Sequence, residues 1–235
     1  QARAVVPLPV HDVVVEWLML GGFEDEKGVR KQKILLLATP KELVARYERI
    51  CSIAGVKLRG LEVEGMSLAR AIAHGERGEA LLVDIGARST GLYVLDDGRV
   101  KLSSQTDFSA GSLTRAVAQG MGIASRRAEE LKRRRGLVGT GGEYELSTLM
   151  LPYVDVILQE VRRLRDTYTQ SYHGVIGKVI LTGGGSSLLG LAEYASAELG
   201  LPVAFGAPFT RISYDPFIEP LTSELSGLLA AAIGA

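Results

Sequence analysis

The stretch ALLVDIGARSTGLYVLDDGRV, residues 80–100, decides the fold of this chain because it joins two apolar runs by a polar turn. The runs Ala80–Ile85 and Thr90–Leu95 are rich in Leu, Val and Ile, as buried strands are. An Asp-Asp-Gly sequence then gives a strong hairpin signal before a third strand at Arg99–Ser104. We therefore expect a meander, with the carboxylate of Asp84 near the end of its first strand.

Asp84 stands where an apolar strand runs into a small, hydroxyl-rich turn. A carboxylate in that position lies in the crevice where the strand backbone ends, and the nearby Gly86 lets a phosphate approach the main chain without a Cβ in the way. Ser89 and Thr90 add hydroxyl donors, and the turn amides can face an anion. We expect Asp84 to hold Mg²⁺ through water, because that ion keeps much of its hydration shell. The alternative is an ordinary turn with an exposed aspartate.

Three consecutive glycines, Gly183, Gly184 and Gly185, separate a predicted strand at Lys178–Leu181 from a predicted helix at Leu188–Leu199. Amides at a helix N-terminus attract anions, and consecutive glycines let a flat ring or a phosphate lie against the chain. The spacing matches neither Gly-x-Gly-x-x-Gly nor the Walker A sequence. A tight turn accounts for one glycine but not for three, so we interpret this corner as part of a binding site.

A strongly charged helix is predicted at Arg126–Arg135. Glu129 and Lys132 are three residues apart and share a face, so they could form an ion pair or could jointly hold a ribose and a base. The cations at the end of the helix lie at the negative end of its dipole, which explains most of them. Because no aromatic residues are interleaved with the cluster, it does not indicate nucleic-acid binding.

The chain divides at a polar Gly-Glu-Arg-Gly segment, residues 75–78. Before the division we expect an α+β unit, residues 1–78, with a helix that begins at a capping box at residues 39–42 and buries one face, including Cys51. After it, residues 79–235 run through strands, helices, a strand and a helix, which predicts an α/β protein with a mixed sheet. The remaining predictions are strands at His11–Leu20, Gln32–Ala38, Val56–Val63 and Val203–Phe205, and helices at Met66–Ala73, Ser112–Met121, Tyr144–Tyr172 with a break near Pro152, and Thr222 to the end.

Composition excludes several classes of protein. The chain has 235 residues, 46% of them hydrophobic, which is enough for one large core or two small ones and argues against disorder. Lys and Arg together number 27, as do Asp and Glu, so no global field draws the chain to nucleic acid or an anionic membrane, and any such binding must be local. One cysteine fits a reducing compartment, and the three histidines have no metal-ligand spacing.

The apolar stretch 225–235 is too short to span a bilayer and is interpreted as a docked core helix of a cytoplasmic protein.

Taken in order along the chain, these features form a series. An Asp-x-Gly hairpin is followed by a helix that opens with Gly-Ser-Leu-Thr at residues 111–114, by Ala-Glu-x-x-Lys at residues 128–132, and by Leu-Thr-Gly-Gly-Gly at residues 181–185. The series resembles the second lobe of the actin-like ATPases and, most closely, the family of the type IV pilus assembly protein PilM, which is related to the division protein FtsA. The stretch VPLPVHDVVVEW, residues 6–17, is similar to the part of that family that leads into its inserted small subdomain.

The resemblance covers nearly the whole chain and implies its architecture. Residues 79–235 would form an actin-like (RNase H-like) α/β ATPase lobe with a mixed sheet and a C-terminal helix that returns toward the first lobe. Residues 1–78 would form the small inserted α+β subdomain, with part of the first lobe.

The resemblance also implies roles for individual residues. In this family the Asp-x-Gly hairpin is the second phosphate loop, and the Ala-Glu-x-x-Lys helix and the glycine corner contact the nucleoside. The implied cofactors are ATP and Mg²⁺, with the metal at Asp84. The implied nucleotide-binding residues are Asp84, Gly86, Ala87, Ser89, Thr90, Gly111, Glu129, Lys132, Gly183, Gly184 and Gly185.

Two departures from the family pattern change these expectations. Ala110 stands where the family often has the first glycine of a pair, which puts close approach of a ligand at that point in question. The family's first phosphate loop, another Asp-x-Gly with a nearby lysine on an N-terminal lobe, does not precede Gln1. Since half of the nucleotide clamp would then be missing, we expect this fragment to bind ATP weakly and to be inactive, and the full-length protein to be at most a slow ATPase.

The family also implies a partner and a location. In PilM-like proteins, a cleft between the first lobe and the inserted subdomain binds the N-terminal cytoplasmic peptide of the membrane protein PilN. The resemblance therefore implies a cytoplasmic scaffold, held at the inner face of the inner membrane by a PilN-like protein, with part of the groove on residues 1–78. Other inner-membrane pilus components and self-association are further implied contacts, and nucleic acid is not expected. Two alternatives stay open: a nucleotide-free secretion-system scaffold of the same fold, and a small-molecule kinase of the same superfamily.

Overall fold

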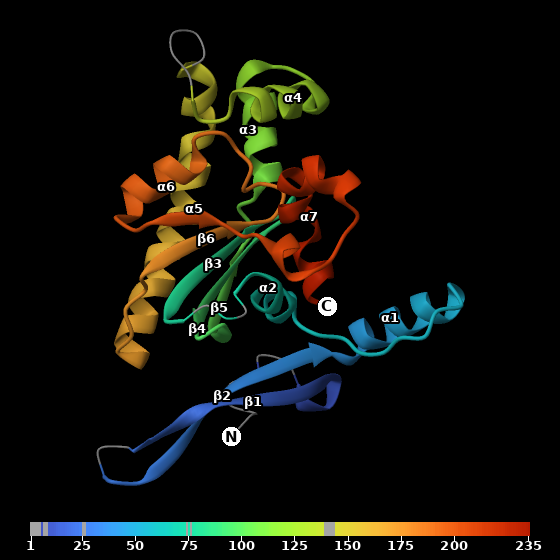
Figure 1. Ribbon diagram of the computed structural model, residues 1–235, viewed down its shortest axis with the longest axis vertical. Coiled ribbons are helices and arrows are strands. Elements are labelled where there is room, and N and C mark those ends of the chain that lie inside the picture. The colour runs from blue at the N-terminus through green and yellow to red at the C-terminus, as the bar shows by residue number, and fades with distance from the viewer. Residues whose placement is uncertain (1–5, 7–8, 25–26, 74, 76, 139–143) are drawn as a thin grey trace. The chain divides into compact units, whose positions relative to one another are not determined.

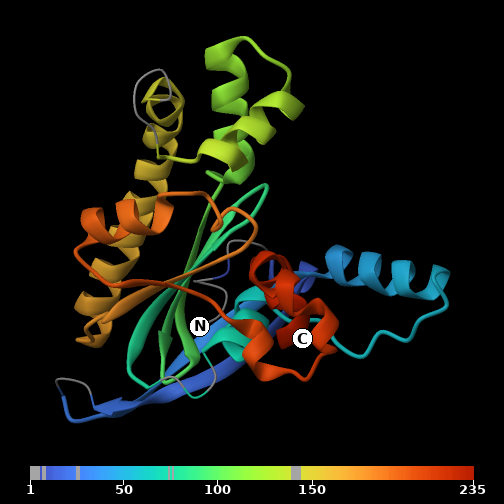
Figure 2. The ribbon, with the colours of Figure 1, turned by 45° about the horizontal axis from the view of Figure 1, so that its top comes forward.

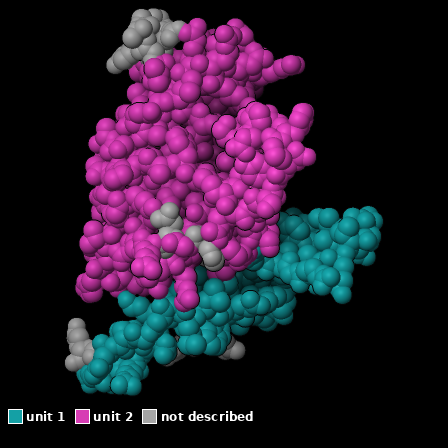
Figure 3. Space-filling model, viewed as in Figure 1, with its two compact units in different colours: residues 1–62 teal, residues 63–235 magenta. Residues whose placement is uncertain are grey.

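The computed structural model describes residues 6, 9–24, 27–73, 75, 77–138 and 144–235. By its internal contacts the chain forms two units, residues 1–62 and 63–235 (Figure 3). This division falls before the polar segment at residues 75–78, because the helix α2, Glu64–Ile72, packs against elements of the second unit.

The first unit is a long β-hairpin followed by a helix (Figure 1). Its two strands are antiparallel, with Trp17 opposite Leu36, and a bulge shifts the register between Met19 and Gly21. Both strands contain many apolar residues, which favours an extended, pleated backbone. The elements are η2 (Val10–Asp12), β1 (Val13–Glu24), β2 (Arg30–Pro40) and α1 (Lys41–Ile53).

Three expectations for the early part of the chain are wrong. The helix α1 has Pro40 at its N-cap and no side-chain cap hydrogen bond, so it starts one residue too late for the predicted capping box. It also buries none of its residues: Ile53 is 78% exposed and Cys51 is half-buried. Residues 56–63 form no strand, because neither sheet of the described chain offers them a partner.

The second unit contains a five-stranded mixed sheet in the order β5-β4-β3-β6-β7. The first three strands form the predicted antiparallel meander, and β6 and β7 continue the sheet in parallel with β3. Its strands are β3 (Glu79–Ile85), β4 (Thr90–Asp96), β5 (Arg99–Thr106), β6 (Lys178–Thr182) and β7 (Val203–Phe205). Its other helices are α3 (Ala110–Met121), α4 (Ser125–Arg135), α5 (Tyr144–Tyr172), α6 (Leu191–Leu199), η4 (Pro208–Arg211), η5 (Pro216–Leu221) and α7 (Thr222–Gly234).

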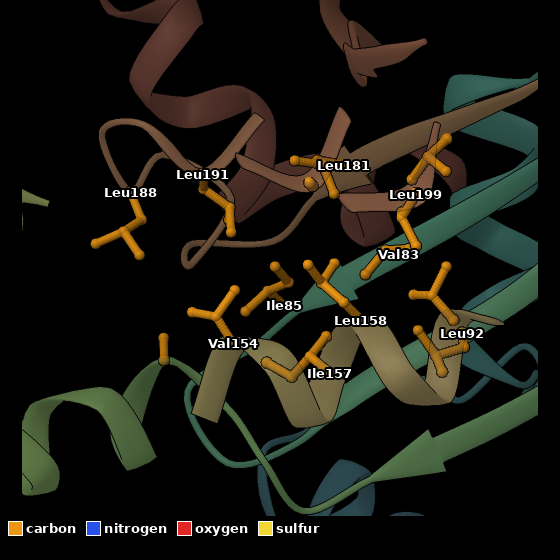
Figure 4. Packing of buried hydrophobic residues seen from close by; sticks show 14 of the residues in the cluster. Val83, Ile85, Leu92, Val154, Ile157, Leu158, Leu181, Leu188, Leu191 and Leu199 are labelled. Carbon is orange, nitrogen blue, oxygen red and sulfur yellow. The ribbon is translucent and has the colours of Figure 1, made fainter. Parts of the chain in front are cut away.

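Helices cover both faces of this sheet and create two cores. On one face, strand residues such as Val83 and Leu181 pack against α3, α5 and α6 (Figure 4). On the other face, Leu82 and Ile180 pack against α2 and α7. Figure 2 shows these two helices beside the sheet. Since strand side chains alternate between the faces, Asp84 lies on the side of α2 and α7.

The helix α5 continues through Pro152, where a break was expected. Pro152 is exposed and has no N–H to donate, yet the helix runs on to Tyr172. None of the helices among the described residues combines the length and the apolar character needed to cross a membrane.

The helix α7 packs against α2 and against the glycine corner at two close contacts. Gly227 lies against the carbonyl of Gly183, and Gly234 lies against the carbonyl of Ser67 on α2; a Cβ at either glycine would overlap the facing oxygen. The C-terminal apolar segment is therefore a docked helix of the second unit, as its composition predicted.

Candidate functional site

The carboxyl ends of β3 and β6 bring Asp84 and Thr182 side by side. The two strands are parallel and these residues are register partners, so both side chains lie on the face that α2 and α7 cover. Thr182 is 1% exposed, and in the described part of the chain its Oγ1 is the one buried side-chain oxygen or nitrogen without a hydrogen-bond partner. Buried polar atoms normally have a partner, so this hydroxyl marks a place where a ligand or water can bind.

A second carboxylate, Glu64 at the start of α2, lies close enough to act on Asp84. Burial, and then repulsion by Glu64, raise the pKa of Asp84 from 3.8 to about 6. Burial, and then the charges of Asp84 and Glu64, raise the pKa of Tyr93 to about 12. The cluster therefore favours a cation. No group of three or more His, Cys, Asp or Glu that could hold a metal occurs among the described residues, so a cation here would keep most of its water ligands.

The turn after β3 is fastened to the start of α3. The amides of Ala110 and Gly111 donate to the carbonyls of Gly86 and Ala87, at 3.0 and 3.2 Å. Gly111 allows this approach, because a Cβ there would overlap the Ala87 carbonyl oxygen. The turn and the first residues of α3 therefore form one continuous edge.

The two hydroxyls expected to face a phosphate lie in different environments. Thr90 is fully buried and donates to the carbonyl of Phe108 at 2.7 Å, so it holds the turn against the segment before α3. Ser89 is half-buried, and its carbonyl accepts from the amide of Gly86 at 3.0 Å. Of the pair, Ser89 is the better placed to contact a ligand.

The helix predicted to follow the glycine corner from Leu188 begins three residues later. After Gly183 the chain makes a series of turns as far as Gly190, and α6 begins only at Leu191. The amide of Gly185 donates to the Ile85 carbonyl at 2.8 Å, which ties the corner to β3. Gly184 is exposed. The corner therefore offers a bare backbone surface rather than a helix N-terminus.

Glu129 and Lys132 form a short ion pair on α4, with 2.7 Å between Nζ and Oε2. Lys132 is 6% exposed and also donates to the Ala110 carbonyl at 3.1 Å and to Thr114 Oγ1 at 3.0 Å. Burial would raise the pKa of Glu129, but hydrogen bonds from Lys132, Thr114 and Arg133 outweigh it and lower the pKa to about 2. Glu129 is thus ionised at neutral pH, and Lys132 joins α4 to α3.

A pocket of about 150 Å³ lies between this ion pair and the glycine corner. Asp84 is outside the pocket and touches the corner on its other side, at Gly183, where a Cβ would overlap Asp84 Oδ1. Three segments far apart in sequence therefore meet at the corner, but the expected single cavity is lined by the glycines and the ion pair and not by Asp84. The pocket is lined by Ala110, Leu113, Glu129, Lys132, Arg133, Gly184, Gly185, Ser187, Leu188 and Glu224.

The sequence pattern did not indicate two acidic residues of this region. Glu64 begins a short helix, and Glu224 lies in the first turn of α7; neither belongs to a spaced motif. Only the packing of α2 and α7 on the same face of the sheet brings them near the corner. A long-range contact of this kind leaves no local signal.

The sequence of this chain was compared with protein-family models and with curated proteins. A family model described as "Type IV pilus assembly protein PilM" matches residues 1–234. Among curated proteins, the cell division protein FtsA of Escherichia coli (strain K12) is 22% identical over 233 residues, covering 86% of this chain and 56% of the relative. The chain thus spans about half the length of the curated relatives that it matches.

Solved structures show the fold. The PilM-PilN type IV pilus biogenesis complex aligns with a TM-score of 0.82 and 25% identity, covering 99% of this chain and 68% of that one. MreB5 of Spiroplasma citri bound to AMPPNP aligns with a TM-score of 0.63 and 14% identity, covering 83% of this chain and 63% of that one. The fold is therefore that of the actin-like proteins.

Proposed function

Because the chain belongs to the family of the type IV pilus assembly protein PilM, within the actin-like ATPase superfamily, we propose that it is part of a nucleotide-binding scaffold for pilus assembly. The observation that carries the nucleotide part is the meeting of the glycine corner, the Glu129–Lys132 ion pair and the acidic end of β3. The alternative within the same fold is a nucleotide-free scaffold. That function would not explain why the ionised Glu129 faces the backbone of Gly184 and Gly185 across a pocket.

The pocket suits a nucleoside. Gly184 and Gly185 present backbone without side chains, against which a flat ring can lie. Glu129 is ionised and can accept hydrogen bonds from ribose hydroxyls, while Lys132 is bonded to Ala110 and Thr114 and acts as a positioning residue for Glu129. Ser187 adds a hydroxyl to the lining. We assign ATP as the nucleotide from the family.

The end of β3 fits a hydrated Mg²⁺. Asp84 and Glu64 supply negative charge, and the unpartnered hydroxyl of Thr182 can bond to a water ligand. When bound, Mg²⁺ would neutralise the phosphate charge at this edge of the site. In the chain itself, Asp84 and Ser89 would orient water and phosphate, and the Gly86–Ala87 turn would hold that edge against α3. Any ATP turnover would be slow.

Isothermal titration with Mg-ATP tests the nucleotide site. In the full-length protein, Glu129→Gln is expected to weaken binding about tenfold, because one charge-assisted hydrogen bond is lost. Glu130→Gln is the matched control: it removes the neighbouring carboxylate of α4, which is exposed and pairs with Arg127 rather than lining the pocket. Equal affinities for both variants, or no Mg-ATP binding by the parent protein, would favour the nucleotide-free scaffold.

We infer that the first unit contributes to binding the N-terminal cytoplasmic peptide of a PilN-like membrane protein. One solved structure that resembles this chain is a PilM-PilN type IV pilus biogenesis complex. Trp17 and Met19 on β1 and Ile34 on β2 lie on one face of the hairpin by register and are 58%, 64% and 48% exposed. Such a row can pack against the apolar side chains of a peptide. Binding would hold a cytoplasmic protein at the inner face of the inner membrane.

Peptide titration tests this assignment. Trp17→Ala is expected to weaken binding of a PilN-like N-terminal peptide at least about tenfold, since buried Trp residues dominate interfaces. Leu18→Ala is the control, because Leu18 is 46% exposed but points to the opposite face of the hairpin. Similar losses for the two variants would contradict the assignment to the Trp17 face.

A further inference from the structure

The helix α4 carries a strongly basic exposed face, distinct from the ion pair that it directs into the pocket. Its exposed charged side chains include a single acid, Glu130. The buried Lys132 pairs with Glu129 and does not belong to this face. The arginine face consists of Arg126, Arg127, Arg133 and Arg134, all exposed.

Neighbouring acids compensate only part of this charge. Arg126 and Arg127 share Glu130, at 3.9 and 3.1 Å, and Arg133 pairs with Glu129 at 2.8 Å. The Arg126 side chain is still 94% exposed, and the Arg133 side chain 73%. Since the whole chain has a formal net charge of zero, the face is a local excess of positive charge on a neutral protein.

Two exposed apolar side chains lie just beyond the basic end of α4. Val138 is 61% exposed and Leu189 is 50% exposed. A hydrogen bond of 2.8 Å from the Leu137 amide to the Leu189 carbonyl holds the two segments together. Val138 therefore follows the last arginines of α4 closely in the chain, and Leu189 lies on a segment that is hydrogen-bonded to the residue before it.

We propose that the arginine face of α4 binds an anionic phospholipid surface directly. Guanidinium groups bond to phosphate in a bidentate manner, and several basic residues on one helix are attracted to acidic headgroups. Val138 and Leu189 can enter the boundary between headgroups and acyl chains, as the apolar residues of peripheral proteins do. A nucleic acid would instead require aromatic stacking platforms, and α4 carries no aromatic residue. The proposal does not rest on nucleotide binding.

Co-sedimentation with vesicles tests it. The purified protein is expected to bind vesicles of 30% phosphatidylglycerol in phosphatidylcholine and not to bind vesicles of pure phosphatidylcholine. It is expected to dissociate as the salt concentration rises, because screening shortens the range of the attraction. The double variant R126E/R134E is expected to bind at least about tenfold more weakly. R126K/R134K keeps the charges and should retain most of the binding.

The control is R99E/R163E, which changes the net charge equally on exposed side chains of β5 and α5. It is expected to bind these vesicles like the parent. No binding by the parent, no loss in R126E/R134E, or an equal loss in R99E/R163E would each overturn the proposal. If the parent bound heparin or an acidic peptide but no vesicles, and R126E/R134E lost that binding, the arginine face would bind another polyanion and the lipid assignment would be wrong. None of the four arginines lines the nucleotide pocket, so Mg-ATP titration should be unchanged in all variants.

Discussion

Gly183→Ala is expected to lower the free energy of unfolding by about 3 kcal/mol. Gly183 has φ of +82°, a left-handed conformation that costs a residue with a Cβ roughly 1–2 kcal/mol. The new methyl group would also overlap Asp84 Oδ1 and lie 2.6 Å from the Ile85 carbonyl oxygen, and overpacking of this kind typically adds about 1–3 kcal/mol. Urea unfolding followed by circular dichroism measures the loss.

Gly200→Ala separates the two contributions. Gly200 also has a left-handed φ, +65°, but no atom lies within 4 Å of the position that its Cβ would take. Its substitution should therefore cost only the conformational part, roughly 1–2 kcal/mol. If both variants lost the same stability, the close packing of the corner around Gly183 would not be the cause.

Asp84→Asn is expected to stabilise the protein by about 3 kcal/mol at pH 7, since a pKa difference of one is worth about 1.4 kcal/mol, while weakening its binding of Mg-ATP. The pKa of Asp84 is raised to about 6 in the folded state, so between pH 3.8 and 6 the folded protein holds a proton that the unfolded chain has lost. Stability of the parent therefore falls as the pH rises through this window, and it stays lower above it. Asn has no charge to desolvate, so the variant should lack this decline, and its advantage should vanish below about pH 4.

The two readouts of Asp84→Asn distinguish a functional acid from a structural one. Urea unfolding at pH 4, 5.5 and 7.5 gives the stability difference, and titration with Mg-ATP gives the affinity. Asp166→Asn is the control, since its side chain is 60% exposed on α5 and far in sequence from the site. If Asp84→Asn were less stable than the parent at pH 7.5, the ionised carboxylate of Asp84 would stabilise the folded state, and the prediction would be wrong.

Much of the second unit could be predicted from the sequence because its strands carry their own signals. The predicted strand Val203–Phe205 is confirmed to the residue, and the meander differs only at the ends of its strands. Continuous apolar runs between turn sequences are local features, so no knowledge of the fold is required to find them. The resemblance to the PilM family and the actin-like fold are likewise confirmed.

The predictions that failed concern features that depend on partners. Residues 56–63 largely alternate apolar and polar side chains but pair with neither sheet of the described chain, and α1 is amphipathic but buries none of its residues. At the glycine corner the predicted helix Leu188–Leu199 begins only at Leu191, because the chain makes further turns as far as Gly190. Glu64 and Glu224 reach the site through helix packing alone. The assignments of the site residues to ATP and Mg²⁺ stay predictions.

The two glycine contacts of α7 also limit how this part of the molecule can move. Gly227 and Gly234 are seven residues apart, two turns of the same helix face, and each fits beneath a carbonyl of a different segment. Sliding α7 along its axis by one turn, about 5.4 Å, would put larger side chains in both places. These contacts therefore oppose sliding of α7 along its axis, and a shift of its first turn, where Glu224 lines the pocket, would also disturb the contacts with the glycine corner and with α2.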